Sequence, residues 1–208
     1  IEESLNRADD FEMEAVRTLI IYPMNALVSD QLARFRKIMG GEEFKQIFTG
    51  ASGASRIPHF GMYTGRTPYS GESKKQSNLK LADIYRQQYL ISENMTEDES
   101  IQQRKKIDGL KSINKYPARD GGEEGLKKFI DNLEKGIHQP SPYDAEYITR
   151  FEIQNNAPDI LITNYSMLEY MLMRQMESNI WDNTKRWLEK SDENRLLIVL
   201  DEAHMYRG

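Results

Sequence analysis

The sequence predicts an α/β domain built on a parallel β-sheet with flanking helices. Aliphatic runs at residues 18–22, 159–164 and 196–200 have the length and composition of buried strands. Each of the first two leads into an Asn at a helix N-cap position and then into apolar residues at helical spacing. A strand, a tight turn and a helix form half of a parallel βαβ unit, so we expect these strands to share one sheet.

Composition places the chain among soluble proteins. Of its 208 residues, 38% are hydrophobic and 29% are charged, and no apolar run approaches the ~20 residues that span a bilayer, so we expect no membrane partner. Cysteine is absent, which excludes disulfides and Cys-based metal sites, and the acidic N-terminus shows no signal peptide. We therefore expect a cytoplasmic protein. The net charge of −5 argues against an overall basic nucleic-acid binder but is compatible with a local groove.

The first strand–helix unit follows an acidic, weakly patterned stretch at residues 1–16. Pro23 ends the strand at 18–22, because proline cannot donate to the ladder. Asn25 then occupies the N-cap position of a helix that Gly40-Gly41 stops. The apolar positions of that helix are Leu27, Val28, Leu32, Phe35, Ile38 and Met39.

Residues 57–65 predict another short strand, which leads into the turn Gly65-Arg66-Thr67-Pro68. Two interpretations of its arginine are open. Arg66 either contacts a phosphate or is an ordinary solvated loop side chain.

The stretch from residue 70 to residue 146 is polar, and we expect it to be a mainly helical insertion. Helical patterns lie near 79–90 and 126–133. Basic clusters in this stretch alternate with acids, which favours a solvated surface over one that tracks nucleic acid. The insertion divides the α/β domain into residues 1–69 and 147–208.

Regular patterning returns with the strand at 159–164, which ends in Thr163-Asn164. The Asn again caps a helix, whose buried face we expect to carry Leu168, Met171, Leu172 and Met176. A helical stretch over 180–190 places Trp181 and Trp187 against the sheet. The final strand over 196–200 is wholly aliphatic, and we expect it to be buried on both faces.

Polar residues follow these strands at their carboxyl ends, where ligands bind in open α/β sheets. Asp201 and Glu202 come directly after the last strand. Asp201 suits a hydrated Mg²⁺ that bridges phosphates, and Glu202 suits the activation of a water molecule. The helix N-termini at Asn25 and Asn164 offer free N–H groups to phosphates without reading bases. The plain alternatives are solvated acids after a strand and ordinary capped junctions.

Four segments resemble motifs of superfamily 2 helicases. Asp201-Glu202-Ala203-His204 is the DEAH form of the Walker B motif, and residues 22–31 resemble motif Ia, although Met24 replaces a common Thr. Residues 63–68 resemble a Tyr-x-Gly-x-Thr-Pro turn, and residues 158–165 resemble a Pro-Asp-Ile-Leu-x-Thr-Asn-Tyr stretch. Their order is similar to that in the first RecA-like domain of DEAD/DEAH-box helicases. The residues of these motifs resemble most closely those of bacterial DNA helicases of the Lhr and YprA/MrfA kind, including relatives in phage-defence systems.

The resemblance implies a RecA-like fold of the P-loop NTPase type and ATP-dependent helicase activity. It implies that Asp201 holds Mg²⁺ through water, that Glu202 activates the water that attacks ATP, and that His204 couples the nucleotide state to a second RecA-like domain. Arg150 matches an arginine that often precedes the Thr-Asn stretch. The resemblance also implies contacts with a DNA strand, RNA not being excluded, from Pro23, Asn25, Ala26, Gln31, Gly65, Arg66, Thr67, Thr163 and Asn164.

One motif of that family is missing from the sequence. It contains no Gly-x-x-x-x-Gly-Lys-Ser/Thr segment, and the glycine-rich residues 50–55 include no lysine. Because the Walker lysine neutralises charge on the β- and γ-phosphates, we expect this chain alone to bind ATP poorly and to hydrolyse little. The chain begins with Ile1 and stops soon after the last strand, which we interpret as a fragment of a longer ATPase.

Three other interpretations remain. A degenerate RecA-like fold would serve as a non-catalytic module that binds nucleic acid or another protein. A metal-dependent nuclease is disfavoured, because Pro158-Asp159 has no Asp/Glu-x-Lys after it. A metal site made of Asp201, Glu202 and His204 is weaker still, since all three side chains would have to converge from one short turn.

Overall fold

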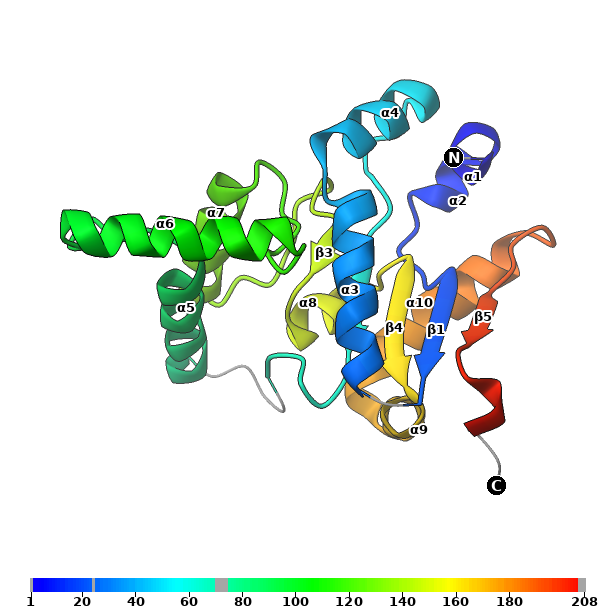
Figure 1. Ribbon diagram of the computed structural model, residues 1–208. Coiled ribbons are helices and arrows are strands. Elements are labelled where there is room, and N and C mark those ends of the chain that lie inside the picture. The colour runs from blue at the N-terminus through cyan, green and yellow to red at the C-terminus, as the bar shows by residue number, and fades with distance from the viewer. Residues whose placement is uncertain (1, 24, 70–74, 206–208) are drawn as a thin grey trace.

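The computed structural model describes residues 2–23, 25–69 and 75–205, and these residues form a five-stranded parallel sheet with helices around it (Figure 1). The strand order is β3-β2-β4-β1-β5. The predicted α/β class is confirmed, and the arrangement is consistent with a RecA-like fold. The strands are β1 (Thr18–Tyr22), β2 (Phe60–Tyr63), β3 (Glu146–Tyr147), β4 (Ile160–Asn164) and β5 (Leu197–Leu200).

Helices cover both faces of this sheet, with α3 in front of it and α10 behind it in Figure 1. Two short 3-10 turns, η1 and η2, follow α9 and β5. The helical elements are α1 (Glu2–Asn6), α2 (Ala8–Phe11), α3 (Asn25–Met39), α4 (Glu42–Ser52), α5 (Lys75–Tyr89), α6 (Glu97–Ser112), α7 (Glu123–Glu134), α8 (Arg150–Asn155), α9 (Tyr165–Met173), η1 (Gln175–Glu177), α10 (Ser178–Lys190) and η2 (Ala203–Met205).

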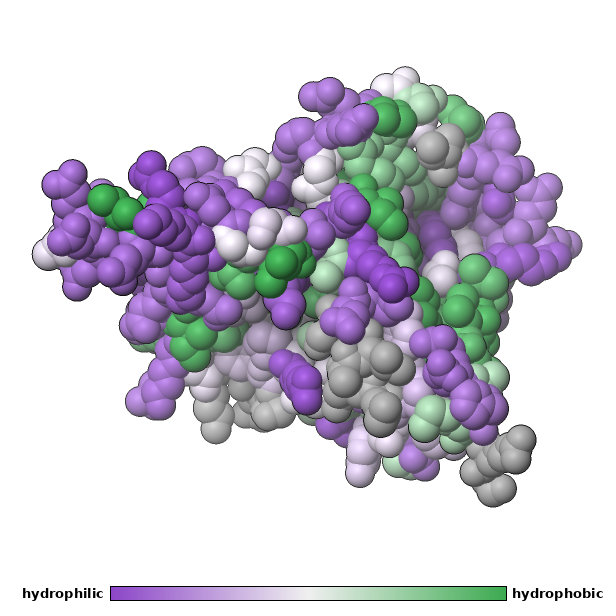
Figure 2. Space-filling view, viewed as in Figure 1, coloured by the Kyte–Doolittle hydropathy of each residue, from purple (hydrophilic) through white to green (hydrophobic). Residues whose placement is uncertain are grey.

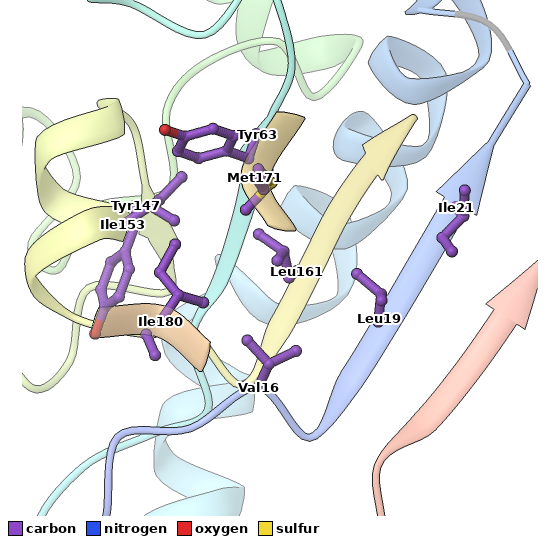
Figure 3. Close-up of a cluster of buried hydrophobic side chains, with 10 residues drawn as sticks. Val16, Leu19, Ile21, Tyr63, Tyr147, Ile153, Leu161, Met171 and Ile180 are labelled. Atoms are coloured by element: carbon purple, nitrogen blue, oxygen red, sulfur yellow. The ribbon is translucent and has the colours of Figure 1, made fainter. Parts of the chain in front are cut away.

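The strand side chains alternate between two hydrophobic clusters, as the period of a pleated strand requires. Ile20 of β1 and Ile162 of β4 face α3, where they pack with Val28. Leu19 and Leu161 point to the opposite face, where Figure 3 shows them beside residues of α9 and α10. Burial of both faces explains why β1 and β4 are almost uniformly aliphatic.

The predicted insertion contains α5, α6 and α7, which extend to the left of the sheet in Figure 1. These helices share a hydrophobic cluster of their own that includes Ala82, Ile107 and Leu126. The patterns near 79–90 and 126–133 correspond to α5 and α7. We did not predict α6, although Thr96 and Glu99 form a capping box at its start.

The expectation that the last strand is buried on both faces is wrong. Among the described residues, β5 is an edge strand that pairs with β1 alone, and its side chains are exposed by 38–58%. Figure 2 shows this hydrophobic surface at the right of the view. An aliphatic run indicates a strand whose side chains are suited to burial. It does not indicate whether another element of the described chain packs against that strand.

The predicted buried face of α9 is wrong in part. Met171 is fully buried and Leu168 is partly buried, as expected, but Leu172 is 65% exposed and Met176 is 45% exposed. Leu172 lies about 100° around the helix from Met171, since a helix has 3.6 residues per turn. Met176 lies in η1 and no longer follows the helical register, because α9 ends at Met173. Trp181 and Trp187 do pack as predicted.

Sequence patterns also missed α4, α8 and the two-residue strand β3. A capping box of Thr149 and Glu152 marks the start of α8 and was visible in the sequence. Within the described residues, no helix has the length and apolar character needed to cross a membrane.

Candidate functional site

The carboxyl ends of β1, β2, β4 and β5 meet at one edge of the sheet. Tyr22 of β1 is in register with Asn164 of β4, and Tyr63 of β2 is in register with Thr163. On the other side of β1, the amide of Asp201 donates to the carbonyl of Ile21 at 3.0 Å. The acidic pair after β5 and the capped helix after β4 are therefore separated by a single strand. This is the juxtaposition that the sequence predicted.

Asp201 and Glu202 occupy the sharp bend between β5 and η2. Asp201 is half-buried beside Tyr22, and burial followed by the charge of Asp201 raises the pKa of the Tyr22 phenol. Glu202 has φ of 49°, in the left-handed region that non-glycine residues seldom adopt. Its carboxylate lies 3.3 Å from Nδ1 of His204, and both side chains are about half exposed or more. The bend therefore presents two carboxylates and an imidazole to solvent.

The carboxylate oxygens of this bend have the chemistry of Mg²⁺ ligands, since a hydrated Mg²⁺ is typically bound through one or two carboxylates. Asp201 is half-buried and its backbone amide is bonded to β1, so it fits that role better than Glu202, which contacts His204. Among the residues that the structure describes, no group of three His, Cys, Asp or Glu side chains is arranged to hold a metal ion. The three-residue metal site considered from the sequence is therefore not formed.

At the end of β4, Asn164 is the N-cap of α9, as predicted. Its side chain accepts a hydrogen bond of 2.8 Å from the amide of Met167. Thr163 is fully buried, and its hydroxyl donates to the carbonyl of Tyr63 at 2.6 Å. Thr163 thus connects the ends of β4 and β2, while Asn164 sets the direction of the helix that follows.

The turn after β2 is built around two threonines. Thr67 is buried, and its hydroxyl donates to the carbonyl of Met62 at 2.6 Å and accepts from the amide of Thr64 at 2.9 Å. The hydroxyl of Thr64 accepts from the amide of Arg66 at 3.2 Å. Gly65 and Arg66 are exposed at the tip of the turn. Of the predicted contacts in this turn, Gly65 and Arg66 are available to a ligand, whereas the Thr67 side chain shapes the turn.

The motif Ia-like segment is described only in part. Pro23 is half-buried after β1, α3 begins at Asn25, and Gln31 is half-buried farther along that helix. Met24 and the side chains of Asn25 and Ala26 lie outside the described residues. The backbone nevertheless starts α3 at the same edge as α9, because β1 and β4 end in register.

Asp159 lies at the opposite, amino end of β4 and serves the core. Its carboxylate accepts from Arg56 at 2.7 and 2.9 Å, from Arg17 at 2.9 Å and from the amide of His59 at 2.8 Å. Burial opposes its ionisation, yet the two guanidinium groups hold the pKa of Asp159 below its usual value. A carboxylate occupied in this way is poorly suited to binding the metal of a nuclease.

Sequence reasoning missed a group of polar residues beneath the turn after β2. Tyr63, Gln154, Arg174 and Glu177 are linked there by hydrogen bonds, and Arg150 lies beside them. Tyr63 and Arg150 belong to segments that resemble helicase motifs, but no motif identifies Gln154, Arg174 or Glu177, because these residues come from separate elements that meet only in the fold.

Comparison with known proteins finds similarity to a protein of a defence system, Druantia. The chain is 39% identical to Druantia protein DruE from Escherichia coli (strain UMEA 4076-1). The alignment extends over 225 positions and covers 99% of this chain, but the chain spans only 12% of the DruE sequence. No protein-family model matches the chain, and no solved structure matches it significantly.

Proposed function

We propose that this chain is part of the ATPase core of an ATP-dependent DNA helicase or translocase. The observation that carries the proposal is the convergence at one sheet edge of Asp201 and Glu202 with the strand ends that precede α3 and α9. In open α/β sheets such an edge is where nucleotides and their metal ions bind. The similarity to DruE is compatible with a nucleic-acid-related role.

In this proposal Asp201 would hold Mg²⁺ through a water ligand, and the ion would supply the positive charge that offsets the phosphates of ATP. Glu202 accepts the proton of the attacking water. Nδ1 of His204 lies 3.3 Å from that carboxylate and restricts the orientation of the Glu202 side chain. In this proposal His204 also contacts a second RecA-like domain and so couples that domain to the nucleotide state. The sequence lacks the Walker A lysine, so complete ATP binding needs groups beyond these 208 residues.

The same edge serves the nucleic acid. The N-termini of α3 and α9 offer backbone N–H groups to successive phosphates, and Arg66 adds a cation at the tip of the neighbouring turn. Contacts of this type fix the register of a strand without reading its sequence. We propose DNA as the strand, and RNA is the alternative to be compared in the same assay.

The test is Glu202→Gln in the complete protein that carries this chain. The variant should lose DNA-stimulated ATP turnover while its affinity for DNA stays unchanged, because the substitution removes a proton acceptor and leaves the phosphate contacts intact. Glu189→Gln is a matched control, since Glu189 is an exposed acid on α10 that forms an ion pair with the exposed Lys185. Unchanged turnover in Glu202→Gln would refute the role given to Glu202.

A second candidate is a non-catalytic module that binds nucleic acid through a degenerate RecA-like fold. Such a module would use the exposed Gly65 and Arg66 and the N-termini of α3 and α9 as contacts and would need no nucleotide site. Single-stranded DNA binding without any DNA-stimulated ATP turnover in the complete protein would establish this module instead of the helicase.

A further inference from the structure

A buried polar cluster lies beneath the turn after β2, and we name it the Arg150 cluster. Its members come from β2, α8 and the segment that follows α9: they are Tyr63, Arg150, Gln154, Arg174 and Glu177. Three side-chain atoms of this cluster are buried without a hydrogen-bond partner, namely Nε of Arg150, Nε of Arg174 and Oε2 of Glu177. A buried group of this kind needs an explanation, since leaving polar atoms unpaired is costly.

Arg150 holds both ends of the turn at once. Its Nη2 donates to the carbonyl of Thr64 at 2.7 Å, and its backbone amide donates to the carbonyl of Pro68 at 3.1 Å. Arg66, the exposed cation, lies between these two anchors. Arg150 itself is 6% exposed and therefore reaches the turn from below. Its two hydrogen bonds fix the start and the end of the loop that carries Arg66.

Tyr63 provides the surface on which Arg150 rests. The guanidinium carbon of Arg150 lies 5.2 Å from the centre of the Tyr63 ring. The Tyr63 hydroxyl donates to Glu177 at 2.6 Å and accepts from Gln154 at 2.8 Å. Burial and then the Glu177 carboxylate raise the pKa of this phenol, so it stays protonated and remains a donor. The ring is thus fixed by α8 on one side and by η1 on the other.

Within the described residues, no carboxylate lies within ion-pair distance of Arg150. Burial lowers its pKa, as expected for a cation removed from water. A side chain that served stability alone would be better paired, because an unpaired buried charge is strongly unfavourable. The position of Arg150 is therefore explained more directly by the turn that it holds than by the packing of α8.

We propose that Arg150 is a positioning residue for nucleic-acid binding, which acts by fixing the 64–68 turn so that Arg66 faces a phosphate. This inference rests on the proposed function and deepens it. Arg150 does not contact the nucleic acid in this account. Its effect on binding passes through Arg66, and the effects of removing the two residues should therefore not add.

The test is a double-mutant cycle in the complete protein, with Arg66→Ala, Arg150→Met and the pair combined. Binding of a fluorescein-labelled oligothymidine is measured over a range of salt concentrations. Each single variant should lower the slope of log affinity against log salt by about one phosphate contact, and the double variant should also lower it by about one rather than two. Arg150→Lys should restore part of the affinity, since an ammonium group can still donate to the Thr64 carbonyl. Arg195→Met, which removes an exposed arginine elsewhere, is the control.

The double-mutant cycle distinguishes three roles for Arg150: positioning of Arg66, direct phosphate contact and a purely structural role. A double variant that loses two contacts would show that Arg150 touches phosphate directly. Unchanged affinity and slope in a folded Arg150→Met protein would leave Arg150 a purely structural role. Both results overturn the inference.

Hydrogen exchange separates this inference from the proposed function. Arg150→Met should accelerate exchange of the amides of residues 64–67 while those of β1 and β4 stay protected. Protection of the turn that does not change would overturn the inference even if the wild-type protein binds DNA. Failure of the wild-type protein to bind any oligonucleotide would instead overturn the proposed function, whatever the turn does.

Discussion

Replacement of Asp159 with Asn should destabilise the fold strongly, because Asp159 is the acceptor for two buried guanidinium groups. Its side chain is 5% exposed and that of Arg56 is 9% exposed. The amide of Asn keeps one oxygen acceptor but loses the charge and the second acceptor. Arg17 retains its hydrogen bonds to Glu3. Among the described residues, Arg56 would keep the carbonyls of Phe11 and Ile57 and at most one bond to the remaining side-chain oxygen of residue 159.

The expected loss is about 3–5 kcal/mol in the free energy of unfolding, the range for breaking a buried pair by removing one partner. With a urea m-value of about 2 kcal/mol/M, the midpoint of unfolding should fall by about 1.5–2.5 M. Urea titration followed by circular dichroism measures it. The exposed Asp192→Asn is the control and should stay within about 0.5 kcal/mol of wild type.

The direction in which this stability difference changes with pH follows from the pKa of Asp159. The pKa of Asp159 is lower in the folded protein than in the unfolded chain, so its stabilisation is present above the unfolded value and is lost as pH falls through the folded value. The difference between wild type and Asp159→Asn should therefore be full at pH 7 and should shrink below about pH 4. A loss under about 1 kcal/mol at pH 7, or one that grows in acid, would refute the assignment of Asp159 as a charged partner of both arginines.

Two further predictions concern surfaces away from the ion pairs. Thr96→Ala should remove the capping box of α6 and lower the free energy of unfolding by about 0.5–2 kcal/mol. Amide hydrogen exchange in the first turn of α6 should become faster, and unchanged exchange there would contradict the cap. The double variant Ile198→Lys/Leu200→Lys should reduce self-association of the isolated chain in sedimentation velocity, because β5 is an exposed apolar edge strand. Equal association of wild type and variant would show that β5 is not the surface involved.

Local patterns were enough to find the strands that build the site. β1 was predicted with its observed bounds, and β4 and β5 to within one residue, because aliphatic runs ended by Pro23, Asn164 and Asp201 leave little freedom of interpretation. The N-cap at Asn164 could be predicted for the same reason, since its hydrogen bond spans three residues. The capping boxes at Thr96 and Thr149 follow the same rule, so the starts of α6 and α8 are also predictable from the sequence.

What the sequence could not show depends on distant partners. The same aliphatic composition is buried in β4 and exposed in β5, because burial is decided by what lies beside a strand and not by the strand. The contact between Arg150 and Thr64 joins residues 86 positions apart, and that between Tyr63 and Glu177 joins residues 114 apart. No periodic pattern carries such information. The sequence therefore contains no sign that Gln154, Arg174 and Glu177 join Tyr63 and Arg150 in one buried cluster.

The insertion is part of this non-local arrangement. The chain leaves the sheet after the turn that follows β2 and returns through β3, which pairs with β2 itself. On its return, Arg119 of the insertion donates to Glu152 at 2.6 Å, and Glu152 also accepts from the amides of Ile148 and Thr149 at the start of α8. The insertion thus fixes the first turn of the helix on which Arg150 is the first residue. A segment that interrupts the domain in sequence consequently stabilises the helix that holds the 64–68 turn.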